Sequence, residues 1–191
     1  MNEREYQLEV RSGLNLIYED VQVQWSPFRR EGRDMYAPIL DIAVGPFAME
    51  RRYENEYTQT LIRTQDFIES LIQKHNENIE RDEEWVSFAQ ILHFNENARC
   101  FLAIEIEHTG SRKHCLGNLV NASALGRVAL LVARSEEVLR IFLRQRVYLA
   151  RLAGYGKNTF KTDNCLVLTE NQLNICLTAL ADSITVPRRV I

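Results

Sequence analysis

Two apolar runs separated by an amphipathic stretch dominate the middle of the chain. The run FLAIEIE at 101–107 is apolar except at Glu105 and Glu107, and 127–133 is a second apolar run. Between them, a turn signal at 108–111 precedes Leu and Val residues at helical spacing over 113–125, which predicts a helix. We therefore expect a strand–helix–strand unit with parallel strands and a right-handed crossover.

The flanking sequence extends this pattern into a layered fold. The alternation at 21–25 and the apolar run at 37–44 predict two strands before the unit, and 54–82 reads as one long helix. Residues 2–12 fit either a helix or a strand, and 83–94 fit a helix or an irregular segment. After the unit we expect a helix from Ser135, a strand at 165–168 and a last helix capped by Thr169. The order predicts an α/β fold with a mixed sheet.

Composition points to one domain spanning 1–191, with a helical insertion at 47–99 and a C-terminal helical extension at 134–191. Hydrophobic residues make up 46% of the chain and charged residues 26%, a profile of ordinary globular domains. No apolar run approaches the ~18 residues of a membrane helix, and the first ten residues do not resemble a signal peptide. We therefore expect a cytoplasmic protein with no membrane partner. The four cysteines form no CxxC pair, which argues against structural zinc.

Three acidic residues interrupt the apolar strands. Asp41 lies inside 37–44, while Glu105 and Glu107 are two positions apart and so share one face of their strand. Like charges held close together repel, and a divalent cation would offset them most simply. Mg²⁺ or Mn²⁺ fits because such ions take carboxylate oxygens and keep several waters. A buried pairing with local arginines remains the alternative.

The helix at 113–125 carries a polar face next to these acids. His114, Asn118 and Asn121 follow one another at i, i+4 and i+7, and Lys113 lies one residue off that face. The face would contact a phosphate or substrate, or else be solvated. Neither a zinc site at His108 and His114 nor a Cys115 nucleophile has the required spacing or partner.

Positive charge is local rather than general. The formal net charge is −3, which is not that of a protein held to nucleic acid by bulk charge. Basic residues nevertheless cluster, and on the helix after Ser135 three arginines share a face. The clusters are Arg29, Arg30 and Arg33; Arg51 and Arg52; Arg112 and Lys113; and Arg140, Arg144 and Arg151. They would bind a phosphate backbone or form a solvated surface.

The chain resembles the PD-(D/E)xK nuclease superfamily, which includes restriction endonucleases. The resemblance lies in the order of Asp41 on one strand, Glu105-Ile106-Glu107 on another, and then a helix and a strand. The resemblance covers residues 14–133. It implies a restriction-endonuclease-like mixed central sheet flanked by helices, with the helical insertion preceding the catalytic strand. By this resemblance, Asp41 and Glu105 would be metal ligands. Glu107 stands where the family usually has lysine, and some type II restriction enzymes have glutamate there too. Leu40 stands where the motif often has proline.

The resemblance implies an Mg²⁺- or Mn²⁺-dependent endodeoxyribonuclease. Asp41, Glu105 and Glu107 would form the metal site, with Asp41 and Glu105 as the main ligands. Glu107 would also position or deprotonate water, and Lys113 would steady the phosphate. DNA would be the partner, bound through Lys113, His114, Asn118, Asn121, Arg140 and Arg144. The alternative is an inactive nuclease-fold subunit that binds nucleic acid or a protein, and a homodimer or larger defence-type complex stays open.

Overall fold

A mixed five-stranded sheet forms the centre of the computed structural model, which describes residues 2–27, 37–48, 51–81, 84–157 and 161–185. The strands lie in chain order and are β1 (Val21–Trp25), β2 (Leu40–Val44), β3 (Cys100–Glu107), β4 (Gly126–Ala133) and β5 (Cys165–Thr169). β1, β2 and β3 pair antiparallel, whereas β3, β4 and β5 are parallel. The predicted α/β class and mixed sheet are confirmed.

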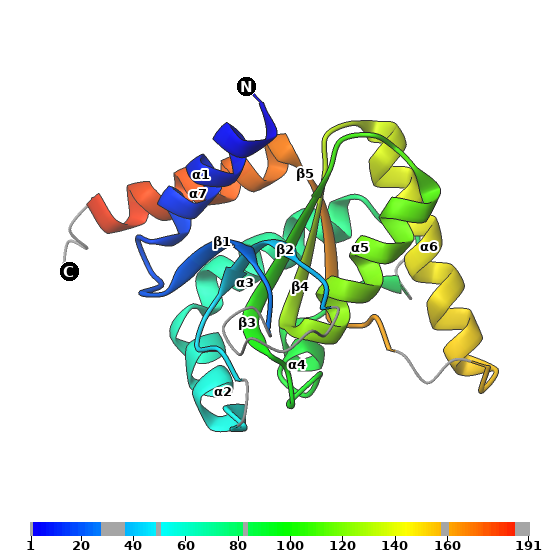
Figure 1. Cartoon of the computed structure of the whole chain (residues 1–191), viewed down its shortest axis with the longest axis horizontal. Helices are drawn as coiled ribbons and strands as arrows, with labels where there is room; N and C mark the ends of the chain where they lie inside the picture. The colour runs from blue at the N-terminus through cyan, green and yellow to red at the C-terminus, as the bar shows by residue number, and fades with distance from the viewer. Residues whose placement is uncertain (1, 28–36, 49–50, 82–83, 158–160, 186–191) are drawn as a thin grey trace.

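Helices cover both faces of the sheet (Figure 1). One layer contains α1 (Glu3–Leu14), α2 (Glu54–Arg63), α3 (Gln65–Glu77), α4 (Phe88–Ile91) and α7 (Glu170–Thr185). The other contains α5 (Arg112–Leu125) and α6 (Glu136–Gly154). α1 and α7 lie side by side, so the first and last described helices of the chain are neighbours in one layer (Figure 1).

The predicted strand–helix–strand unit is β3, α5 and β4. β3 and β4 are buried at every position, as expected for parallel strands covered on both faces. The turn between β3 and α5 uses Gly110 at φ +69, a conformation that glycine adopts without steric cost. The unit therefore places the carboxyl end of β3 next to the start of α5.

The predicted single helix at 54–82 is wrong, because it breaks at Thr64 into α2 and α3. The Thr64 hydroxyl donates to the Thr60 carbonyl at 2.8 Å and accepts from the Tyr18 hydroxyl at 3.2 Å. Back-bonding of this kind bends helices. The buried bond to Tyr18 fixes the break in place.

The remaining helices follow their capping signals. α1 begins with a capping box formed by Asn2 and Glu5, which settles 2–12 as a helix. α6 is capped by Ser135, whose hydroxyl accepts from the Val138 amide at 3.3 Å. The predicted cluster of Arg29, Arg30 and Arg33 lies outside the described residues. Among those described, no helix is long and apolar enough to cross a membrane.

Candidate functional site

Asp41 and Glu105 meet where the β2–β3 ladder ends. The last paired residues are Ile42 and Ile104, so Asp41 and Glu105 occupy the next positions. There the Ile106 amide donates to Asp41 Oδ2 at 2.8 Å, and the Asp41 amide donates to Glu105 Oε2 at 3.4 Å. The two carboxyl groups thus take over hydrogen bonds that the backbone ladder would otherwise make, and this brings them together.

A change of face in β1 and β2 explains how Asp41 reaches this position. Val23 and Ile42 pack in the core beneath α1, whereas Trp25 and Leu40, two residues away on each strand, pack in the opposite core. Regular strands keep residues two apart on one face. The switch occurs at Gln24, whose φ is +52. It turns Asp41 out of the regular alternation and towards α1.

Two glutamine amides hold the outer oxygen of Asp41. Gln7 Nε2 of α1 donates to Asp41 Oδ1 at 3.0 Å, and Gln24 Nε2 of β1 donates to the same atom at 3.1 Å. Gln7 is only 3% exposed. Asp41 therefore receives three hydrogen bonds from the protein, from α1, β1 and β3.

The electrostatics of the pair are unfavourable for two full negative charges. Burial raises the pKa of Glu105 well above its usual range, and the negative charge of Asp41 raises it further. Burial also raises the pKa of Asp41, while the Ile106 amide acts in the opposite direction. A cation or a proton at this point would relieve the repulsion.

Glu107 points to the same face as Glu105 but has separate partners. Its Oε1 accepts from the Thr109 amide at 2.7 Å and the Thr109 hydroxyl at 2.6 Å, and its Oε2 accepts from Asn118 Nδ2 at 3.2 Å. Asn121, one turn further along α5, hydrogen-bonds to Glu105. The two predicted asparagines of α5 thus face the sheet, and each contacts one glutamate.

The predicted basic residues are not drawn into this cluster. Lys113, His114, Arg140 and Arg144 are exposed on α5 and α6, and in the described part of the chain none of their side chains makes a hydrogen bond or ion pair. The structure therefore gathers Asp41, Glu105 and Asn121, with Glu107 and Asn118 beside them. The four basic residues stay on the surface of the same layer.

The donor set fits a cation held by two carboxylates. An ionised carboxylate has about four acceptor positions. Donors from other groups use three on Asp41 and two on Glu105, and one further hydrogen bond joins the two carboxyl groups. Mg²⁺ is often bound by one or two carboxylates and keeps the rest of its shell as water. No group of three or more His, Cys, Asp or Glu side chains in the described ranges is arranged to hold an ion. Any ion here would depend on Asp41, Glu105 and water or substrate.

Sequence reasoning missed the contacts that His108 makes with other polar residues at this end of the strands. At the ends of β3 and β4, His108 Nδ1 lies 2.9 Å from Arg134 Nη1. The same imidazole lies 3.9 Å from Glu3 and 3.8 Å from Glu170, carboxylates of α1 and α7. The available signal was positional, since residues that follow parallel strands meet at one edge of a sheet.

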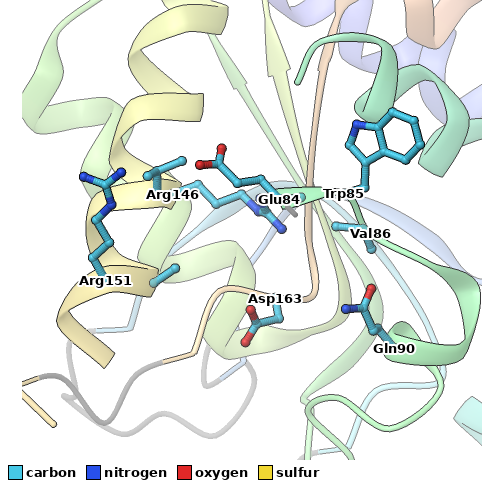
Figure 2. Close-up of a pocket in the computed structure, with 9 residues that line it drawn as sticks. Glu84, Trp85, Val86, Gln90, Arg146, Arg151 and Asp163 are labelled. Carbon is cyan, nitrogen blue, oxygen red and sulfur yellow. Dashed lines mark hydrogen bonds between the residues drawn. The ribbon is translucent and has the colours of Figure 1, made fainter. Parts of the chain in front are cut away.

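A separate pocket of about 300 Å³ lies between α6 and residues 84–90 (Figure 2). Arg146 extends from α6 towards this segment and donates to the Glu84 carbonyl at 3.3 Å. Asp163, which also lines the pocket, precedes β5. The pocket is therefore at the amino ends of the parallel strands, opposite the carboxylate pair.

Comparison with known proteins adds no relative. The chain matches no protein-family model, and neither the curated proteins nor the solved structures give a significant match.

Proposed function

We propose that the protein is a metal-dependent nuclease that hydrolyses phosphodiester bonds of DNA. The observation that supports this proposal best is the contact between Asp41 and Glu105 at the end of the β2–β3 ladder. Strand-borne carboxylates followed by α5 and a parallel β4 are also the arrangement implied by a restriction-endonuclease-like fold. Glu105 is buried and Asp41 half-buried, and two such carboxylates close together are costly unless something positive is held between them.

In this proposal Asp41 and Glu105 bind Mg²⁺ or Mn²⁺. The bound ion would supply a Lewis acid for the scissile phosphate and lower the pKa of a water molecule. Asn121 keeps Glu105 directed to the pair, and Ile106 does the same for Asp41 through its amide. The chain thus provides two fixed ligands and leaves the remaining coordination positions to water and phosphate oxygens.

The other predicted residues have more peripheral parts in the proposal. Both oxygens of Glu107 are bonded to Thr109 and Asn118, so Glu107 would hold water only by exchanging one of these bonds. Lys113 and His114 lie on the first turn of α5, where a flexible lysine reaches a phosphate as a point charge. Asn118, Arg140 and Arg144 would contact DNA from the same layer.

The test combines ion binding with cleavage. Mn²⁺ binding is measured by calorimetry for the wild type, Asp41→Asn and Glu105→Gln, with Glu9→Gln, an exposed glutamate of α1, as matched control. Plasmid nicking is followed in Mg²⁺ and in Mn²⁺. We expect both site variants to lose ion binding and nicking while the control keeps them. Unchanged Mn²⁺ binding in both site variants would refute the proposed site.

The second candidate is a nuclease-fold subunit without hydrolytic activity that binds nucleic acid or a protein. One observation favours it: Asp41 and Glu105 accept hydrogen bonds from the backbone of Ile106 and Asp41, which is a structural task at the end of a ladder. A wild-type protein that binds DNA in Ca²⁺ but cuts no plasmid in Mg²⁺ or Mn²⁺ would select this candidate.

A further inference from the structure

Two amides from different elements converge on one oxygen of Asp41. Gln7 comes from α1 and Gln24 from β1, and both donate to Oδ1. Gln24 Nε2 also lies 3.4 Å from Gln7 Oε1, and Gln7 Nε2 lies 3.3 Å from Glu3 Oε1. The two glutamines and Asp41 form one connected network between the N-terminal helix and the first strand.

The chemistry of this network decides which oxygen of Asp41 faces β3 and Glu105. An ionised carboxylate accepts but cannot donate, so both glutamines must present their nitrogens to it. Oδ1 then holds the two glutamine donors, while the Ile106 amide holds Oδ2 against β3, where Glu105 lies. Glu105 is close enough there for its carboxyl group to hydrogen-bond with that of Asp41. Rotation of the carboxylate would break all three bonds.

The network is kept despite a cost in backbone energy. Gln24 has a φ of +52, a region that non-glycine residues seldom adopt because it strains the backbone. Gln7 is an amide withdrawn from solvent into the contact between α1 and the sheet. Gln24, with its strained backbone, and Gln7, with its buried amide, both bind the same carboxylate. Such an arrangement indicates that the carboxylate is held in a fixed orientation.

We propose that Gln7 and Gln24 are positioning residues that fix Asp41 for the ion it shares with Glu105. Because Gln7 belongs to α1, ion binding is thereby coupled to the docking of α1. This inference rests on the proposed ion site, and it identifies the docking of α1 as what regulates ion binding there. Coupling is reciprocal, so an ion held by a correctly oriented Asp41 stabilises the docked helix, and a docked helix strengthens ion binding.

Mn²⁺ affinity of Gln7→Leu and Gln24→Gly tests the positioning role. Loss of a residue that orients a metal ligand typically lowers metal affinity 10- to 100-fold, and we expect at least a tenfold loss in each variant. Gln22→Leu is the matched control, because Gln22 lies on the same strand and its amide donates to Asp20 instead. Affinity equal to the wild type in both variants, with the wild type binding Mn²⁺, would overturn the inference but leave the ion site standing.

The melting temperature separates positioning from a structural role. Gln24→Gly removes the amide and relieves the strain of a positive φ, so we expect weaker Mn²⁺ binding without a lower melting temperature in the ion-free protein. A residue with only a structural role would give the opposite result, a lower melting temperature with unchanged Mn²⁺ affinity.

Hydrogen exchange tests the coupling to α1. We expect the α1 amides to exchange more slowly when Ca²⁺ is bound, and this protection to disappear in Gln7→Leu. Exchange of α1 that does not respond to Ca²⁺ in a wild type that binds the ion would overturn the coupling. A wild type that binds neither Mn²⁺ nor Ca²⁺ would instead refute the proposed function.

Discussion

At the scale of single residues, the site is built from side chains that replace backbone hydrogen bonds. Asp41 accepts from the Ile106 amide, and Glu105 accepts from the Asp41 amide. A regular strand would satisfy these groups with carbonyl oxygens, at no electrostatic cost. Using two carboxylates instead introduces repulsion, and such sites trade stability for function.

This cost can be measured with Glu105→Gln. Since burial raises the pKa of Glu105 in the folded protein, its stabilising contribution is complete below the unfolded pKa near 4.3 and is lost as pH rises. We expect the variant to be more stable than the wild type at pH 8, by about 1–3 kcal/mol, and the difference to shrink towards pH 4.5. Urea denaturation at both pH values checks this. A variant less stable than the wild type at pH 8 would contradict it.

His75 predicts a pH effect of the opposite sign. Its Nδ1 accepts from the Val167 amide at 3.0 Å, and burial lowers its pKa to about 3, with the nearby charge of Arg146 acting in the same direction. The unfolded chain binds a proton near pH 6.5, whereas the folded protein does not, so stability falls from pH 6.5 down to about 3. From this residue alone we expect a loss of about 2 kcal/mol at pH 5.

The matched variant is His75→Asn, whose amide oxygen can still accept from Val167. It is expected to be less stable at pH 7 because it leaves a small void, but its stability should change less between pH 7 and 5. Equal pH slopes for the two proteins in guanidinium denaturation would mean that His75 is not the titrating group.

The positions of the acidic residues of the candidate site could be predicted from sequence, but the residues that hydrogen-bond to Asp41 could not. Asp41 and Glu105 stand out because they interrupt apolar strands, and adjacent strands then bring them together. Gln7 and Gln24 do not stand out, since each belongs to an ordinary polar position in its element. Their contacts with Asp41 span 34 and 17 positions and depend on the positive φ of Gln24, which no local pattern encodes.

At the scale of elements, two glycines near α5 differ in the space available for a side chain. A Cβ on Gly126, at the start of β4, would lie 2.7 Å from the Ala103 Cβ, whereas one on Gly117, in α5, would meet nothing within 4 Å. We expect Gly126→Ala to destabilise by about 1–3 kcal/mol through overpacking. Gly117→Ala should stabilise by about 0.5–1 kcal/mol, because alanine favours the helix. Thermal denaturation of both variants checks the pair, and a destabilising Gly117→Ala would contradict the helical environment described for α5.

Hydrophobic periodicity in the sequence predicted some boundaries of helices and strands but not others. The strand–helix–strand unit was predictable because its apolar runs are continuous and its turn carries glycine. The break between α2 and α3 was not, because Thr60 and Thr64 fit a helical pattern on their own. The break depends on Tyr18, 46 positions away, which bonds to Thr64. Long-range hydrogen bonds therefore set the boundary that the local pattern leaves open.

At the scale of the whole molecule, the proposed DNA surface lies on the side of the sheet that Glu105 and Glu107 face, whereas Asp41 is turned towards α1 on the other side. Glu105 and Glu107 face α5, and α6 packs beside α5, with Gln145 donating to the Arg112 carbonyl at 2.7 Å. Arg140 and Arg144 are exposed on this layer. The formal net charge of −3 gives no general attraction to DNA, so any attraction must come from such a local surface.

The salt dependence of DNA binding tests this surface. Each phosphate neutralised on duplex DNA contributes about −0.9 to the slope of log K against log salt, because condensed counterions are released. If Arg140 and Arg144 each contact a phosphate, replacing both with Gln should reduce the magnitude of the slope by about 1.8.

The matched control replaces Arg11 and Arg63, exposed arginines of α1 and α2 on the opposite layer, with the same change in net charge. Binding is measured by fluorescence anisotropy in Ca²⁺ at several salt concentrations. We expect the control to keep the wild-type slope, whereas equal slopes for all three proteins would show that the α6 arginines form only a solvated surface.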